Sequence, residues 1–205
     1  MISGKVTRLL LAAATFCAAA GASTVFNFDS DGLGTSTNFT DMVNGLSATF
    51  SSPADPGGFV VYASMFDTLT GNVLGDPGPA GADNLDLSIA FSENLGALSL
   101  DFATADFGTP SPLTITAYEN STLVGSSSAT GSFPSGFSFP EGQVSLSGKT
   151  FNQLVVSSTA PDFAIDNIAV TAAPEPAAIA LFGLGLLALA LPRRAVKSKR
   201  AATAE

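Results

Sequence analysis

The most informative strand pattern in this chain reads FAIDNIAV, from Phe163 to Val170. Its first two large apolar residues, Phe163 and Ile165, share one phase of a two-residue alternation. The last two, Ile168 and Val170, share the opposite phase. Successive side chains of a strand point to opposite faces of a sheet, so one extra residue is needed to bring both pairs to one face. The pattern therefore predicts a β-strand with a bulge at Asp166 and Asn167.

The same alternation recurs upstream, which makes the middle of the chain all-β. Apolar residues alternate with Ser, Thr or Asp, and Pro- and Gly-rich turns separate the segments. We expect strands at 25–29, 46–50, 59–62, 85–91, 98–102, 113–118, 122–127, 144–146, 154–157 and 163–171. No sustained 3.6-residue period intervenes. About ten short strands predict an antiparallel β-sandwich, jelly-roll-like, over 23–172.

The first residues have the order of a secretory signal. Lys5 and Arg8 form a short positive segment, and the next twelve residues carry no charge. Ala20 and Ala22 then place small side chains at the two positions that signal peptidase requires. We therefore expect residues 1–22 to form a signal helix that signal peptidase removes during export.

The C-terminal segment, 173–205, begins with the tripeptide Pro174, Glu175 and Pro176. An uncharged apolar run follows over 177–191.

At ~1.5 Å per residue this run gives a helix of roughly 22 Å, short for a membrane span. Basic residues that flank such a helix can snorkel to the membrane surface. A basic end follows at 193–200: Arg193, Arg194, Lys197, Lys199 and Arg200. The pattern predicts a transmembrane helix with its basic end in the cytoplasm and the main domain outside, the orientation that the signal also requires.

Together, the tripeptide, the short apolar helix and the basic end resemble the PEP-CTERM sorting domain of Gram-negative bacteria. The resemblance implies recognition by an exosortase, a membrane-embedded cysteine protease, and processing near the motif. It also implies anchoring in the inner membrane during transit, then a place at the cell surface or in the extracellular matrix. Proteins of this class often accompany exopolysaccharide production. The alternative from the residues alone is an ordinary single-span anchor.

A second, looser resemblance concerns the fold. The stretch from Phe26 to Gly32 (FNFDSDG) and the stretch 163–170 resemble the opening and closing strands of jelly-roll surface domains, including many with a PEP-CTERM tail.

Charge is distributed unevenly along the chain. Fifteen of the seventeen acidic residues lie between 23 and 172, whereas Lys149 is the only basic residue there, which gives this segment a formal charge of −14. Such a domain repels nucleic acid and anionic lipid. The acidity fits either solubility of an exported protein or the binding of extracellular calcium.

Missing residue types exclude several kinds of chemistry. The chain has no His, and its single Cys, Cys17, lies in the expected signal. A Ser-His-Asp triad, a Cys-His dyad, a His-based zinc or iron site and a disulfide are therefore excluded from the mature domain. Because Trp is also absent, a platform for sugar rings would have to use Phe or Tyr.

Asp29 and Asp31 form a candidate calcium site with Asp166. The two aspartates precede Gly32 with a spacing shared by calcium loops, but Thr40 stands where an EF-hand would have its Glu. First and last strands often lie side by side in a jelly roll, which would bring Asp29 or Asp31 to Asp166. Turn capping by these aspartates is the alternative.

The sequence thus favours a non-enzymatic surface or matrix protein with a structural or adhesive role linked to exopolysaccharide. A carbohydrate-binding module, with calcium as an assisting ion, is the alternative. A glycan-active hydrolase is the third hypothesis, since paired carboxylates are its minimum requirement, but no spacing here marks a catalytic pair. No catalytic residue and no further cofactor are predicted.

Overall fold

The structure, a computed structural model, describes residues 23–76, 85–174, 183 and 185. Three expected features lie outside the described residues: the signal helix (1–22), the apolar helix (177–191, its two glycines excepted) and the basic end (193–200). Within the described part, no helix is both long enough and apolar enough to cross a bilayer.

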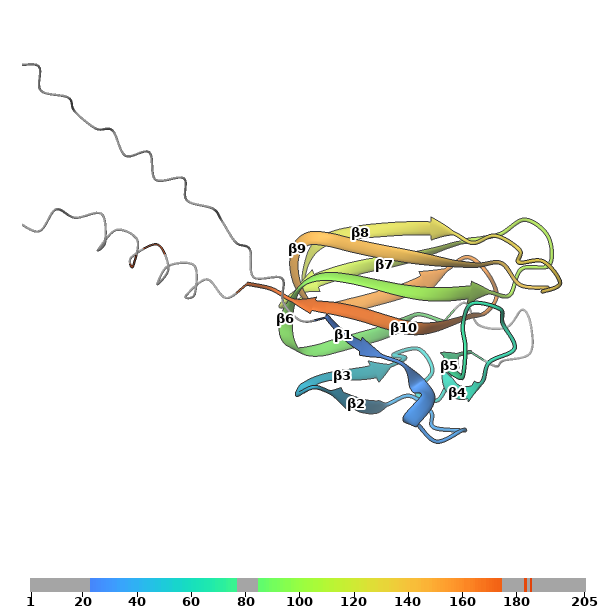
Figure 1. The fold of residues 1–205 in the computed structure, drawn as a ribbon, viewed down its shortest axis with the longest axis horizontal. Coiled ribbons are helices and arrows are strands. Elements are labelled where there is room, and N and C mark those ends of the chain that lie inside the picture. The colour runs from blue at the N-terminus through green and yellow to red at the C-terminus, as the bar shows by residue number, and fades with distance from the viewer. Residues whose placement is uncertain (1–22, 77–84, 175–182, 184, 186–205) are drawn as a thin grey trace, which may run out of the picture.

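Ten strands and one short 3-10 helix make up the described domain (Figure 1), and all strand pairs are antiparallel. The elements are β1 (Ser23–Phe26), η1 (Phe28–Ser30), β2 (Phe39–Val43), β3 (Leu46–Ser51), β4 (Val60–Ala63), β5 (Asn72–Gly75), β6 (Leu87–Thr104), β7 (Pro112–Glu119), β8 (Thr122–Thr130), β9 (Glu141–Ser158) and β10 (Phe163–Ala172). This confirms the prediction of an all-β antiparallel domain.

Two long strands, β6 and β9, connect the two layers of the fold. Each has 18 residues, and register shifts interrupt their mutual pairing near the middle. The first half of β6 pairs with β3, whereas its second half pairs with β10. One layer therefore contains β2, β3, β7 and β8, and the other contains β1, β4, β5 and β10. Both long strands bend at the left-hand end of Figure 1, so one continuous sheet folds over into a β-sandwich.

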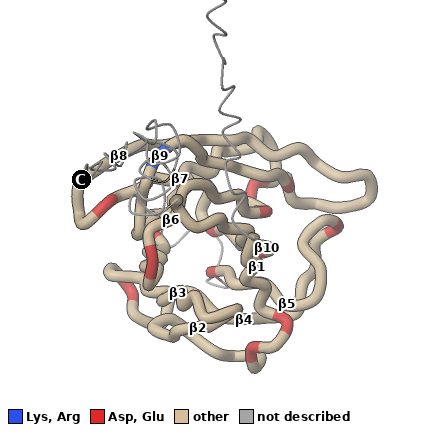
Figure 2. Tube along the Cα trace, turned by 60° about the vertical axis from the view of Figure 1, so that its left-hand side comes forward, with Lys and Arg blue, Asp and Glu red and all other residues tan. Residues whose placement is uncertain are grey.

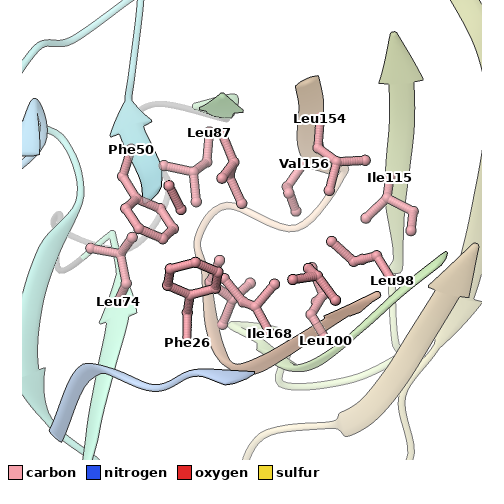
Figure 3. Close-up of a cluster of buried hydrophobic side chains, with 14 of the residues drawn as sticks. Phe26, Phe50, Leu74, Leu87, Leu98, Leu100, Ile115, Leu154, Val156 and Ile168 are labelled. Atoms are coloured by element: carbon pink, nitrogen blue, oxygen red, sulfur yellow. The ribbon is translucent and has the colours of Figure 1, made fainter. Parts of the chain in front are cut away.

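The core lies between the two layers. Figure 3 shows side chains from both layers pointing into one cluster, with Phe26 and Ile168 from one layer and Phe50 and Leu154 from the other. All four are fully buried, and burial of such a side chain contributes roughly 1.5–3 kcal/mol. Because the domain has no cysteine, this apolar core takes the place that disulfides hold in many exported domains.

The bulge predicted in the last strand is present. Asp166 pairs with Asp101 and Ala169 with Ser99, so β10 advances three residues where β6 advances two. Asn167 absorbs the extra residue with a φ of 50°. The apolar residues on both sides of the bulge are consequently buried: Phe163, Ile165, Ile168 and Val170.

Other strand predictions need correction. The segments expected at 85–91 and 98–102 are one strand, β6, and those at 144–146 and 154–157 are likewise one strand, β9. The polar residues between the expected segments cover the bends of these strands and are not turns. Two strands were not predicted. β2 alternates between exposed and half-buried residues, and β5 is a four-residue strand with three buried residues in a row.

The conformation of Asn167 gives a first prediction. A β-branched residue with φ near 50° is strained, whereas Gly adopts it freely. We expect Asn167→Val to destabilise the full-length chain by about 1–2 kcal/mol relative to Asn167→Gly, measured by urea denaturation. Both variants lose the same side-chain hydrogen bond to Asp101, so their difference isolates the backbone. Equal stabilities would contradict the bulge geometry.

Candidate functional site

A pocket of about 420 Å³ opens at one end of the sandwich, where several loops meet. We call this the loop end; it contains the β4–β5 loop (64–71), the β6–β7 loop (105–111), the β8–β9 loop (131–140) and the β9–β10 loop (159–162). The pocket is lined by Tyr62, Met65, Phe66, Asp76, Ala103, Thr104, Ala105, Phe107, Phe139, Asp162, Phe163 and Ala164. Its volume lies in the range of small-molecule sites, and its lining is mostly apolar.

Three phenylalanines from three different loops frame the pocket. Phe139 lies at the centre, with its ring centroid 5.7 Å from that of Phe66 and 5.5 Å from that of Phe107. Phe107 is 74% exposed although it is large and apolar. Other exposed apolar side chains of the loop end are Met65, Phe133 and Phe137. Exposed apolar side chains gathered at one end of a folded domain are typical of a binding surface.

A buried glutamate fixes the β4–β5 loop in this arrangement. One carboxylate oxygen of Glu141 accepts a hydrogen bond from the backbone N–H of Asp67 at 2.9 Å, and the other accepts from both the N–H and the hydroxyl of Thr68 at 2.6 Å. The backbone of Glu141 also pairs in both directions with Ser132, at 2.9 Å each. Glu141 thereby joins two of the pocket loops through charge-assisted hydrogen bonds.

Two aspartates give the apolar pocket a negative wall. Asp76 and Asp162 are at least nine-tenths buried. The backbone N–H of Asp76 donates to the carbonyl of Phe163, and the carbonyl of Asp162 accepts from Ala105, which holds both residues at the start of β10. Burial, followed by the carboxylates of Asp162 and Asp76, raises the pKa of Tyr62 to about 12. The phenol therefore remains protonated at neutral pH.

The structure brings two of the three predicted calcium ligands near each other. β1 pairs with β10, as the sequence predicted, and Asp29 lies close enough to raise the pKa of Asp166. Asp29 also accepts a hydrogen bond from the N–H of Asn72. The carboxyl of Asp31 interacts instead with Asp41, and burial followed by that charge raises its pKa.

Asp166, Asp29 and Asp31 thus do not form a single three-carboxylate site. Among the described residues, no group of three or more Asp, Glu, His or Cys is arranged to hold a metal ion. Calcium binding stays a prediction, which now depends on the Asp29–Asp166 pair together with uncharged oxygen ligands.

Asp166 occupies an unusual environment for a carboxyl group. It is 99% buried at the bulge, and its Oδ2 has no hydrogen-bond partner among the described residues. Burial is the main cause that raises its pKa to about 6, and the charges of Asp29 and Asp101 add to it. Hydrogen bonds from the backbone of Asn167 and Thr70 act in the opposite direction.

Of the predicted sorting and signal residues, only Pro174 lies in the described part of the chain. It follows the end of β10 and is exposed. The others lie outside the described residues: Ala20, Ala22, Glu175, Pro176, Arg193, Arg194, Lys197, Lys199 and Arg200.

The aromatic pocket was not among the features predicted from the sequence. The absence of Trp restricts any sugar platform here to Phe or Tyr, and the pocket is lined by four Phe and one Tyr. The sequence feature that could have indicated the pocket is the segment 133–140, which reads FPSGFSFP. Its Pro, Ser and Gly are turn residues, so its three Phe could not all belong to one alternating core strand.

The chain matches no protein-family model and no curated protein. Similar solved structures include the K2 cleaved adhesin domain of Lys-gingipain, with 16% identity and a TM-score of 0.47, over 73% of this chain and 99% of that chain. A family 29 carbohydrate-binding module in complex with mannohexaose has 13% identity and a TM-score of 0.39, over 74% and 92%. The catalytic domain of a GH87 α-1,3-glucanase has 11% identity and a TM-score of 0.34, over 71% and 30%. Identities and TM-scores this low carry no functional information, so the function of this chain is inferred from its own residues.

Asp166 gives a prediction for stability against pH. Its pKa is about 6 in the folded chain and 3.8 in a model peptide, so between these values the folded state holds a proton that the unfolded state has lost. Stability from this group is complete below pH ~4 and falls as the pH rises through ~6, by about 3 kcal/mol at most. We expect Asp166→Asn to remove this fall in urea denaturation of the full-length chain between pH 4 and 7.

The wild type and Asp166→Asn also test calcium binding. Millimolar calcium at pH 7 should stabilise the wild type more than Asp166→Asn, with sodium chloride at equal ionic strength as the control. An unchanged wild-type stability would remove the calcium hypothesis, and identical pH profiles for the two proteins would contradict the pKa of Asp166.

Proposed function

We propose that this chain is an exported, non-enzymatic surface or matrix protein that binds a polysaccharide through the loop-end pocket. The observation that supports this most directly is the aromatic frame of exposed Phe107 and half-buried Phe66 and Phe139 around a pocket that also contains acceptors for hydroxyl groups. Sugars combine apolar C–H faces with many hydroxyls, and this pocket offers a partner for each. Aromatic rings would pack on the sugar face, and carboxylates would accept from its hydroxyls.

The position of the pocket also favours an adhesive role. β10 begins in the pocket with Phe163 and ends at Ala172, shortly before the proposed sorting motif. At ~3.3 Å per residue, this strand places the pocket about 30 Å from the end that leads to the tail. Figure 1 shows β10 running along the sandwich from the loop end to the opposite end. A domain anchored through its tail would therefore present the pocket away from the membrane.

The tail supports the remainder of the proposal. Signal peptidase would remove residues 1–22, the segment 177–191 would hold the chain in the inner membrane, and an exosortase would process it near Pro174, Glu175 and Pro176. The mature protein would then reach the cell surface or the extracellular matrix, where exopolysaccharide is its proposed partner.

Binding can be tested with a panel of neutral, acidic and amine-bearing oligosaccharides and the full-length chain, with calcium or with EDTA. We expect binding to at least one class, and at least a tenfold loss of affinity in Phe107→Ala, which corresponds to about 1.4 kcal/mol. The ring is exposed, so its removal should leave thermal stability nearly unchanged. Leu123→Ala is the matched control, since Leu123 is 61% exposed at the opposite end of β8.

Two results would contradict this function. If no oligosaccharide binds in either condition, or if Phe107→Ala binds as the wild type does, the pocket is not a glycan site. If incubation with a bound oligosaccharide releases reducing ends, the protein is a glycan-active hydrolase.

Sorting has its own test. Alanine substitution of Pro174, Glu175 and Pro176 together should leave an unprocessed precursor in the inner-membrane fraction, detected by immunoblotting. Deletion of residues 201–205, beyond the basic cluster, should not change processing. Normal processing of the alanine variant would contradict exosortase recognition at this motif.

A further inference from the structure

The loop-end pocket combines two contrasting features. Its walls are aromatic and apolar, yet two carboxylates, Asp76 and Asp162, form part of the same lining. Burying a carboxylate near apolar groups costs free energy, and a positive ligand group beside these carboxylates would offset part of that cost.

None of the described residues that line the pocket is basic. Lys149 is the only basic residue between 23 and 172. It lies in the middle of β9, packed beside Gly125, and eight residues along β9 separate it from Glu141 at the loop end. At ~3.3 Å per residue this is about 26 Å along the strand, compared with a screening distance of ~8 Å at physiological salt. Figure 2 shows this isolation: acidic segments surround the sandwich, and the basic segment lies near β9.

The aromatic groups add to the negative character of the pocket. The faces of aromatic rings carry negative partial charge and attract cations within about 6 Å of the ring centre. Five aromatic rings belong to the lining, from Tyr62, Phe66, Phe107, Phe139 and Phe163. A positive group on a partly apolar ligand would therefore be stabilised by both the rings and the carboxylates, whereas an anion would be repelled by both.

We infer that the pocket binds a sugar residue that carries a protonated amine, as in a polysaccharide with free amino groups, and that it excludes acidic sugars. This inference rests on the proposed polysaccharide binding and names its substrate class. The ammonium would lie against the carboxylates of Asp76 and Asp162, and the sugar face would pack on Phe107 and Phe139. A carboxylate has several acceptor positions, so it can accept from the ligand in addition to its partners in the protein.

A metal ion fits this pocket less well than an ammonium group. Hard cations such as calcium take six to eight oxygen ligands, and most of the lining offers carbon atoms. An ammonium group instead gains from aromatic faces and needs only a few acceptors. The chemistry of the lining thus favours an organic cation.

The test compares oligomers of glucosamine with the same oligomers of N-acetylglucosamine, which differ only in the charge of the nitrogen substituent and its acetyl group. Binding to the full-length chain is measured by calorimetry at pH 6 and physiological salt. We expect the amine form to bind at least tenfold more tightly. Asp162→Asn and Asp76→Asn should each reduce this preference at least threefold, and Phe107→Ala should weaken the binding of both forms.

Matched controls separate a specific site from general attraction to an acidic domain. Glu93→Gln removes one exposed carboxylate from β6, between its two halves, and should leave the preference unchanged. Tetralysine carries similar charge without sugar rings and should bind more weakly than the amine oligomer. Equal or tighter binding of tetralysine would overturn the inference in favour of a basic peptide as ligand.

The remaining outcomes distinguish this inference from the proposed function. If neutral or acidic oligosaccharides bind as tightly as the amine form, and Phe107→Ala abolishes that binding, polysaccharide binding stands and amine selectivity is wrong. If none of the sugars binds, both fail. The comparison of the two ligands uses the wild type alone, so it remains decisive even where an aspartate variant does not fold.

Discussion

The arrangement of this domain depends on how β10 is paired. One edge of β10 follows β6 along its length, while the other edge pairs with β5 near its start and with β1 near its end. The bulge at Asn167 lies where one partner gives way to the other. It allows the strand to keep its apolar residues in the core through this change of neighbours. The first strand and the pocket-bearing β4–β5 hairpin are thereby fixed to a single central strand.

The pocket follows from this pairing and from one buried side chain. The strands β4, β6 and β10 supply lining residues, and Asp76 and Asp162 lie directly after β5 and directly before β10. The carboxylate of Glu141 accepts from two N–H groups and one hydroxyl of the β4–β5 loop. The buried side chain of Leu69 and the hydroxyl of Ser64 fix the same loop. Preorganising a loop in this way lowers the entropy that ligand binding would have to overcome. An aromatic side chain such as Phe66 can therefore be held in place on a loop.

Much of the fold could be predicted from the sequence, whereas the pocket could not. Alternation identified most strands, and the change of phase after Ile165 located the bulge, because both signals are local. The continuity of β6 and β9 across two layers was missed, since a bend in a strand and a turn between strands carry the same polar residues. The pocket joins Phe66, Phe107 and Phe139, which are far apart in the chain, so only the strand pairing brings them together.

The acidic residues of the domain are accommodated in different ways at different places in the fold. With a single base present, a buried carboxylate here has to be met by N–H and O–H donors, become protonated, or attract a cation from outside. Glu141 is met by three donors, and the raised pKa of Asp166 favours protonation of that carboxyl group. Asp76 and Asp162, whatever their partners within the protein, also line an aromatic pocket. That position places both carboxylates beside a ligand in the pocket, so the charge of the ligand, more than its shape alone, should govern what this pocket holds.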